Sequence, residues 1–129
     1  MRVSQTEHDV RVCVVLPTYN NARTLLDTIA SIKPLVTDII VVNDGCSDET
    51  SELLADRDDV DVVTHEVNLG KGTAIISGFT RAQALGFTHA ITMDTDGQHD
   101  SADLPVILEA VRKEPDCLVI GCRDLSGEG

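Results

Sequence analysis

The chain of 129 residues has a composition that fits one globular domain, with 42% apolar and 25% charged residues. Acidic residues number 22 against 10 Lys and Arg, which gives a net charge of -12. That charge argues against a nucleic-acid backbone or an anionic membrane as a partner recruited electrostatically. An anionic ligand therefore needs local help from a cation, a lysine or backbone N–H groups.

The sequence carries no sign of export or of a membrane span. Its first residues, MRVSQTEHDVR, lack the apolar core of a secretory signal, and no stretch approaches the roughly eighteen apolar residues of a spanning helix. The four cysteines form no C-x-x-C pair, so free thiols in a reducing compartment are the better interpretation. We therefore expect a cytoplasmic protein without a transmembrane segment in this chain.

A first apolar run at residues 12–16 predicts a buried strand, and Asn21 can cap the helix that follows it. A second run at 39–42 predicts another strand, after which Ser47 or Asp48 can cap a shorter helix. Both runs are rich in β-branched residues, as is typical of strands buried on both faces. The residues expected on the inward face of the first helix are Leu25, Leu26, Ile29 and Ile32.

The rest of the chain continues this alternation. Three further strands are predicted at 60–63, 90–93 and 117–120. A helix is expected from about 72 to 85, stopped by Gly86, and its inward residues are expected to be Ile75, Ile76, Phe79 and Ala82. Ser101 can cap a last helix, whose apolar face is formed by Leu104, Ile107, Leu108 and Val111. Alternating strands and helices predict an α/β fold with a mainly parallel sheet.

In an open parallel sheet, ligands bind at the carboxyl ends of the strands. Four loops are expected at that edge, and each carries unusual polar residues. They read PTYNN (17–21), NDGCSD (43–48), NLGKG (68–72) and DTDGQHD (94–100). The topology alone therefore predicts that these four loops lie together.

The last of these loops suggests a metal site. Asp94 and Asp96 lie two residues apart at the end of an apolar run, so in extended chain their side chains leave the same face. Two carboxylates, with Gln98 as a third oxygen ligand, suit Mg²⁺ or Mn²⁺ in a partly hydrated site completed by substrate phosphates. The alternative is that one acid merely ends the strand. An apolar strand that leads directly into paired acids favours the metal.

The other loops offer nucleotide contacts, each with a plainer alternative. NLGKG presents N–H groups and Lys71 at a helix start, which suits an anion, although it matches neither a P-loop nor a dinucleotide fingerprint. Asp44 could accept hydrogen bonds from a nucleobase or ribose, or form a type I turn. Tyr19 could contact a base or ribose, or pack against the protein. Asn20 could form hydrogen bonds to a ligand or to nearby residues of the chain. His65 is interpreted as structural or solvated, and no Ser/His/Asp grouping can be assigned.

Together the four loops resemble the donor-binding half of family-2 glycosyltransferases of the GT-A fold. The nearest resemblance is to the branch that transfers mannose or glucose to polyprenyl (dolichol) phosphate. The motifs VVLPTYNNARTL, IIVVNDGCSDET, NLGKGTAIISG and MDTDGQHDSADLP fall in the family's order and spacing over about residues 11–123. Each motif alone is weak, but four in order are specific. Asn43 departs from the family, which more often has Asp there.

The resemblance implies roles for particular residues. Those implied to line the nucleoside pocket are Pro17, Thr18, Tyr19 and Asn20, with Asp44 on the base. Those implied to lie near the nucleotide are Lys71 and Gly72. Those implied to hold Mg²⁺ or Mn²⁺ on the diphosphate are Asp94, Asp96 and Gln98, and Asp94 also belongs to the donor-binding set.

For the fold, the resemblance implies a Rossmann-like sheet with helices on both faces, incomplete at its C-terminus because family members continue past the equivalent of Arg123. We expect a nucleotide-sugar-binding domain at 11–123, between a flexible tail at 1–10 and a frayed end at 124–129. The last strand is expected to leave an exposed edge that invites a homodimer.

For function, the resemblance implies an inverting, metal-dependent transfer of a hexose from a nucleotide-diphosphate sugar of the GDP-mannose or UDP-glucose type. The implied acceptor is a polyprenyl phosphate, or else a glycan, and peripheral association with the cytoplasmic face of a membrane is compatible with it. Catalytic residues beyond the metal site cannot be assigned without the acceptor half.

Two rival functions share part of this pattern. D-x-D-G at a strand end is also the nucleophile loop of haloacid-dehalogenase-like phosphatases, but there it normally ends the first strand, and here four apolar runs end at or before it. A nucleotide-sugar-binding module without turnover shares every motif. Only a measurement of activity separates that module from the enzyme.

Overall fold

The computed structural model describes residues 10–93, 95 and 104–113. Its strands are β1 (Val12–Thr18), β2 (Ile39–Asp44), β3 (Asp61–His65) and β4 (His89–Thr92). Its helices are α2 (Ala22–Ile32), α3 (Thr50–Ala55), α4 (Lys71–Ala84) and α5 (Leu104–Lys113). The predicted strand at 117–120 and the predicted cap at Ser101 lie outside the described residues. The other four predicted strands and the four predicted helices are confirmed.

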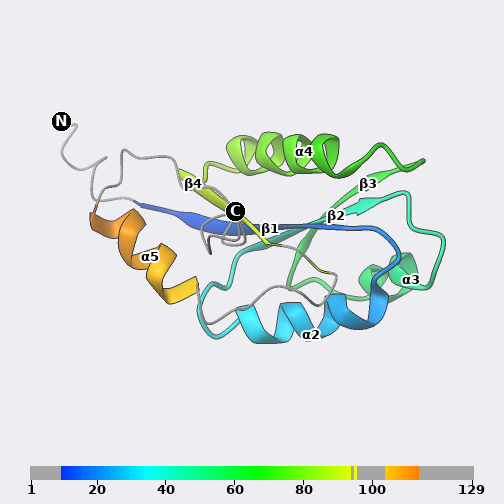
Figure 1. Cartoon of the computed structure of the whole chain (residues 1–129), viewed down its shortest axis with the longest axis horizontal. Coiled ribbons are helices and arrows are strands. Elements are labelled where there is room, and N and C mark those ends of the chain that lie inside the picture. The colour runs from blue at the N-terminus through cyan, green and yellow to red at the C-terminus, as the bar shows by residue number, and fades with distance from the viewer. Residues whose placement is uncertain (1–9, 94, 96–103, 114–129) are drawn as a thin grey trace, which may run out of the picture.

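The four strands form one parallel sheet in the order β3-β2-β1-β4 (Figure 1). The chain moves outward from β1 through β2 to β3, then returns to place β4 on the other side of β1. The strand order therefore reverses between β1 and β4. Such a switch point opens a crevice at the carboxyl ends of the strands, where ligands bind in Rossmann-like sheets. The predicted α/β class and its mainly parallel, Rossmann-like sheet with helices on both faces are confirmed.

Helices cover both faces of the sheet, because β1 and β2 are apolar on both sides. Val14 and Leu16 of β1 belong to one core, which they share with α2, α3 and α5, while Cys13 and Val15 belong to the other, which they share with α4 (Figure 1). Burial raises the pKa of the Cys13 thiol to about 12, and the nearby charge of Asp38 adds to this effect. Cys13 is therefore a packing residue, as its apolar run predicted.

The inward face of α4 differs from the prediction. Its buried residues are the small ones Ala74, Gly78 and Ala82. A Cβ added to Gly78 would lie 2.3 Å from Cγ1 of Val15, so the helix approaches the sheet too closely for a larger side chain. Ile76, predicted to face inward, is 65% exposed, and this prediction is wrong. Ala82 is buried as predicted, and Phe79 packs against the edge of the same core.

The remaining helices follow their sequence patterns closely. The predicted apolar face of α5 is buried, as are Leu25, Ile29 and Ile32 of α2, whereas Leu26 is only partly buried. Asn21 stands at the predicted start of α2 but makes no side-chain capping bond. Within the described residues, no helix has the length and apolar character needed to cross a membrane.

Candidate functional site

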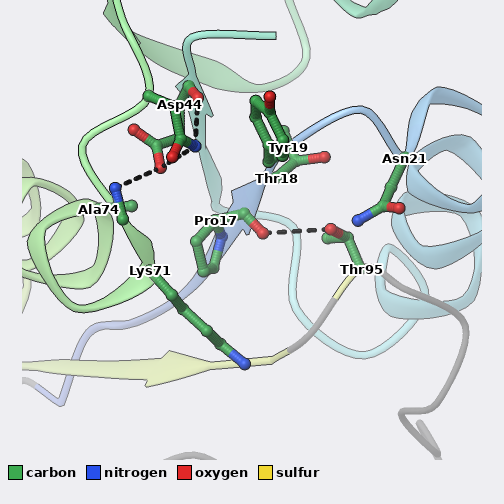
Figure 2. Close-up of a pocket in the computed structure, with 10 residues that line it drawn as sticks. Pro17, Thr18, Tyr19, Asn21, Asp44, Lys71, Ala74 and Thr95 are labelled. Atoms are coloured by element: carbon green, nitrogen blue, oxygen red, sulfur yellow. Dashed lines mark hydrogen bonds between the residues drawn. The ribbon is translucent and has the colours of Figure 1, made fainter.

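A pocket of about 260 Å³ opens at the carboxyl ends of the strands (Figure 2). Residues at or just after the ends of all four strands contribute to it, because parallel strands bring their carboxyl ends to one edge of the sheet. The lining residues are Pro17, Thr18, Tyr19, Asn21, Asp44, Asn68, Gly70, Lys71, Ala74 and Thr95. The four loops that the sequence singled out therefore meet in one place.

The end of β1 supplies the floor of the pocket. Thr18 is only 2% exposed, and its hydroxyl has no hydrogen-bond partner among the described residues. Tyr19 lines the same pocket and is 48% exposed, so much of its side chain is accessible. A buried hydroxyl without a partner costs free energy unless something else supplies the hydrogen bond. The Thr18 hydroxyl is therefore unsatisfied at the wall of the pocket, with almost no surface open to a ligand.

Asn20 does not line the pocket but joins two of its loops. Its backbone lies in the left-handed region, with φ of 57°, a conformation that asparagine tolerates better than most residues. Its side-chain Oδ1 accepts hydrogen bonds from the backbone N–H groups of Ser47 at 2.8 Å and Asp48 at 3.2 Å. Its own N–H contacts Sγ of Cys46 at 3.3 Å. Asn20 thus bonds within the chain, the local alternative that the sequence left open.

Asp48 joins the same two loops from the other side. Its Oδ1 accepts the N–H of Thr50 at 3.0 Å, near the start of α3, and its Oδ2 accepts the N–H of Ala22 at 3.2 Å, the first residue of α2. One carboxylate therefore satisfies free donors at the beginning of two helices. The N-cap position of α3 is Glu49 and not the predicted Asp48, yet Asp48 supplies the acceptor from one residue earlier and also serves the start of α2, where Asn21 makes no capping bond.

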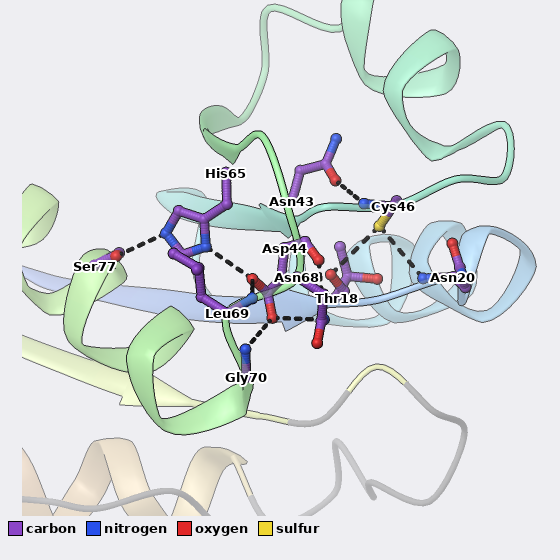
Figure 3. Close-up of polar contacts among 10 residues, drawn as sticks. All are labelled: Thr18, Asn20, Asn43, Asp44, Cys46, His65, Asn68, Leu69, Gly70 and Ser77. Atoms are coloured by element: carbon purple, nitrogen blue, oxygen red, sulfur yellow. Dashed lines mark hydrogen bonds and ion pairs between the residues drawn. The ribbon is translucent and has the colours of Figure 1, made fainter.

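Asp44, the last residue of β2, is the most highly bonded side chain at the pocket (Figure 3). Its Oδ1 accepts from Nδ1 of His65 at 2.8 Å and from the N–H of Leu69 at 2.9 Å. Its Oδ2 accepts from Nδ2 of Asn68 at 3.0 Å and from the N–H of Gly70 at 3.0 Å. A carboxylate offers about four lone-pair positions. The chain itself uses all of them, so Asp44 shapes the pocket by holding the loop that precedes α4.

These hydrogen bonds also fix the charge of Asp44. Burial raises the pKa of this carboxyl, but the bonds from His65, Leu69 and Gly70 outweigh burial and hold the pKa below its usual value. Asp44 is consequently ionised at neutral pH. Its negative charge faces N–H donors rather than open solvent, because its side chain is only 4% exposed.

The glycine after Asp44 permits this arrangement. Gly45 has a φ of 71°, and a Cβ there would lie 2.3 Å from the backbone nitrogen of Asn68. Any side chain at position 45 would therefore push away the loop that Asp44 holds. The D-G pair, which the sequence also allowed as a simple turn, joins β2 tightly to the segment after β3.

The start of α4 closes the pocket on the side of the 68–72 loop. Lys71 lines the pocket, as predicted, while Gly72 does not. Gly70, just before the helix, has a φ of 101°, which aims its N–H at Asp44 instead of continuing the helix. The helix thus starts at Lys71 as the motif suggested, but the N–H groups of Leu69 and Gly70 already donate to Asp44, so anion binding at this helix start remains a prediction.

Thr95 completes the pocket next to the predicted metal ligands. Its hydroxyl donates to the carbonyl of Pro17 at 3.1 Å, and its carbonyl accepts from the hydroxyl of Thr24. Asp94, Asp96 and Gln98 lie outside the described residues. In the part of the chain that the structure describes, no cluster of His, Cys, Asp and Glu side chains could hold a metal ion. The metal site therefore remains a prediction. Thr95, which lies between two of the predicted ligands, does line the pocket.

Comparison with known proteins identifies the fold and the family. The family model described as "Glycosyl transferase family 2" matches residues 13–129. The chain belongs to glycosyl transferase family 2. The match spans all four of the loops that the sequence singled out.

Relatives of this family 2 chain include two curated bacterial proteins. It is 35% identical over 124 residues to the undecaprenyl-phosphate mannosyltransferase of Micrococcus luteus, covering 92% of this chain and 50% of that protein. It is also 35% identical to the polyprenol monophosphomannose synthase of Mycolicibacterium smegmatis, covering 91% of this chain and 46% of that protein. The chain thus spans about half the length of these relatives.

A solved structure shares the fold. Glucosyl-3-phosphoglycerate synthase from Mycobacterium tuberculosis, crystallised with Mn²⁺, UDP and glucosyl-3-phosphoglycerate, superposes with a TM-score of 0.64 at 25% identity. The match covers 83% of this chain and 41% of that protein. The family 2 chain therefore corresponds in fold to part of a larger enzyme.

Sequence reasoning missed several residues of this family 2 site. Asn68 and Gly70 line the pocket from the NLGKG loop, in which only Lys71 and Gly72 were assigned to the nucleotide, and Ala74 lines it from α4. Thr95 was not predicted to line the pocket, because the residues of its loop assigned to the site were the neighbouring aspartates and Gln98. His65 was interpreted as structural or solvated, and the structural alternative is confirmed, but its partner Asp44, which lies opposite it in the register of β2 and β3, was not predicted. The sequence did offer one signal: His65 lies just beyond its predicted strand, as Asp44 lies just beyond the preceding one.

Proposed function

We propose that this chain carries the donor-binding part of a glycosyltransferase that moves a hexose from a nucleotide-diphosphate sugar, of the GDP-mannose or UDP-glucose type, to a polyprenyl phosphate. The observation that carries the proposal is the pocket. Pro17, Thr18, Tyr19, Asp44 and Lys71, all expected to form the donor site, line one cavity at the switch point of the sheet. Two relatives named as lipid-phosphate mannose enzymes support the choice of acceptor.

The chemistry of the pocket suits a nucleotide. Tyr19, which lines the pocket and is half-exposed, can stack on a base. Lys71 at the start of α4 places a cation where a phosphate could bind. This local positive charge matters because the chain as a whole carries -12. The pocket therefore combines the aromatic, polar and cationic groups that a nucleoside diphosphate needs.

A divalent metal would complete this site. Asp94, Asp96 and Gln98 offer two carboxylates and an amide oxygen, which are hard ligands suited to Mg²⁺ or Mn²⁺. Thr95, between the two acids, lines the pocket and bonds to the carbonyl of Pro17, so the chain passes the pocket between these two residues. Bound there, the ion would stabilise negative charge on the departing nucleoside diphosphate.

The proposed transfer inverts the anomeric centre in a single displacement. A lipid phosphate is already an anion at neutral pH, so it can attack without a general base. The residues of this chain would then bind and orient the donor, while the acceptor approaches from outside the described pocket. Attraction to a membrane would come from the lipid acceptor and not from charge, since the chain is strongly acidic.

Isothermal titration of the purified chain with GDP-mannose, UDP-glucose and the two diphosphates, with Mn²⁺ or with EDTA, tests the donor site. We expect metal-dependent binding of one nucleotide, lost in Asp94→Ala and in Asp96→Ala. Asp27→Ala is the matched control, because Asp27 is exposed on α2, away from the pocket. A folded chain that binds none of these nucleotides contradicts the proposal.

Transfer requires a second assay with the nucleotide that binds. The chain is incubated with that nucleotide sugar, a short polyprenyl phosphate and Mn²⁺, and the glycolipid is followed by mass spectrometry. Product formation supports the transferase. Binding without product supports a nucleotide-sugar-binding module and overturns the catalytic part of the proposal for this chain.

A further inference from the structure

His65 connects Asp44 to helix α4 through a buried imidazole. Its Nδ1 lies 2.8 Å from Oδ1 of Asp44, and its Nε2 lies 2.9 Å from Oγ of Ser77 (Figure 3). The side chain of His65 is only 11% exposed. One ring thus joins the end of β2, the end of β3 and the second turn of α4.

The partners determine which nitrogen carries the proton. An ionised carboxylate only accepts hydrogen bonds, so Nδ1 of His65 must donate to Asp44. In the neutral ring Nε2 then accepts from the hydroxyl of Ser77, which can act as donor. Ser77 therefore holds the ring in the orientation in which Nδ1 faces Asp44.

Ser77, His65 and Asp44 are hydrogen-bonded in the order of a nucleophilic triad, but the serine is not placed where a substrate could reach it. Ser77 lies inside α4, and neither it nor His65 lines the pocket. A nucleophile needs access to substrate, which this serine lacks in the described pocket. Only Asp44 of the three reaches the pocket, and it does so as the acceptor of four hydrogen bonds.

We infer that His65 is a positioning residue of the donor site. By donating to Asp44 while Ser77 orients its ring, it fixes the carboxylate that holds the Asn68–Gly70 segment as a wall of the pocket. The consequence for ligand binding rests on the proposed function, whereas the effect on the segment itself does not. Removing the Asp44 contact should therefore loosen Leu69 and Gly70 first and weaken nucleotide binding as a result.

Two isosteric substitutions separate the two contacts of the ring. In His65→Asn, the side-chain amide can place an N–H near the position of Nδ1 and so keep the bond to Asp44. In His65→Gln, the longer side chain places its amide near Nε2, which favours the contact with Ser77 and loses the one with Asp44. Both variants are polar and similar in size, so a difference between them reports which contact matters.

The decisive measurement is amide hydrogen exchange, followed by NMR, at Leu69 and Gly70 in the free chain. In His65→Gln we expect exchange at both amides to be faster by about tenfold or more, as loss of a charge-assisted hydrogen bond implies. In His65→Asn we expect rates near those of the wild type. Amides of β1 should keep their rates in both variants. His89→Asn, at the opposite edge of the sheet, is the control and should change neither amide.

Several results would overturn the inference. Equal rates at Leu69 and Gly70 in the wild type and His65→Gln would mean that the imidazole does not fix the segment. Acceleration of all amides alike would show a general loss of stability. The same behaviour in the Asn and Gln variants would show that the Asp44 contact is not the one that counts.

Nucleotide titration of the same proteins keeps this inference separate from the proposed function. If the wild type binds a nucleotide, the dissociation constant should rise about tenfold in His65→Gln and little in His65→Asn, and a constant unchanged in His65→Gln would overturn the link to binding. If the wild type binds none, the proposed function fails, and the exchange rates alone still decide whether His65 positions the segment.

Discussion

Asp44 shows that the position of a site residue can be predicted from the sequence even when its hydrogen-bond partners cannot. Its position at a strand end indicated a ligand-facing carboxylate, and it does line the pocket. Its partners depend on the pairing of β2 with β3, which sets Asp44 opposite His65 across 21 residues of sequence. No local pattern reports that register. The sequence could therefore place the acid but could not show that its lone pairs are already used.

Replacing Asp44 with Asn should damage the 68–72 loop more than a loss of charge alone suggests. An amide has one acceptor oxygen, and its NH₂ would face the N–H donors that now bond to Oδ1 or Oδ2. We expect Asp44→Asn to lower the free energy of unfolding by about 2 kcal/mol in urea titrations. Asp27→Asn, on an exposed position of α2, should leave it unchanged. A difference of less than about 0.5 kcal/mol between the two variants would contradict this role.

The low pKa of Asp44 predicts a specific acid dependence. Because the pKa is lowered in the folded state, the unfolded chain binds the proton at higher pH, and stability rises with pH between the two values. The contribution is fully present above the unfolded value of about 4 and is lost as pH falls through the lower folded value. Unfolding midpoints from pH 7 to pH 2.5 should fall less steeply in Asp44→Asn than in the wild type. Parallel curves would contradict the prediction.

At the scale of elements, helices with large apolar residues were predicted well and α4 was not. The faces of α2 and α5 are formed by Leu and Ile at helical spacing, so their sequence periodicity is their packing surface. The face of α4 is formed by Ala74, Gly78 and Ala82, which carry little hydrophobic signal. Its larger residues lie on the flanks, where a periodicity argument mistakes them for the core. Close helix–sheet approach is therefore a feature that apolar patterning does not reveal.

Two Gly→Ala substitutions in α4 test this close approach. In Gly78→Ala the new Cβ would meet side-chain atoms of Val15 at 2.3 Å and of Val42 at 3.2 Å, and we expect a loss of about 1–2 kcal/mol in unfolding free energy. Gly72→Ala meets nothing within 4 Å and should be neutral or stabilising by up to about 1 kcal/mol through helix propensity. Urea unfolding measures both. Equal effects would show that α4 has room against the sheet.

At the scale of the whole molecule, the order β3-β2-β1-β4 decides where function can be placed. Each strand-to-helix loop was predictable from the alternation of apolar runs, and their meeting followed from parallel pairing. Which loop contacts which was not predictable, because it depends on the position of β4 beside β1. The sequence thus determined the edge that carries the site, and the strand order determined the composition of its pocket.

The net charge of -12 predicts that salt stabilises the whole chain. Like charges repel more strongly in the compact state, and added ions screen that repulsion. The thermal unfolding midpoint at pH 7 should therefore rise as KCl is raised from about 0.01 M to 1 M. Near the isoelectric point of about 4.4 the same series should have little effect. A salt response of equal size at both pH values would assign it to something other than net charge.

The central place of β1 also bears on how the protein emerges from the ribosome. Strands β1, β2 and β3 are adjacent both in sequence and in the sheet, so they can pair as soon as about residue 65 has left the exit tunnel. Until β4 follows, one side of β1 stays unpaired, and the N–H of Met93 has not yet reached the carbonyl of Val15. Thr95 arrives last of the described pocket residues. A nascent chain stalled before that point has three of the four described strands paired, an open edge along β1 that invites non-native pairing, and an incomplete pocket.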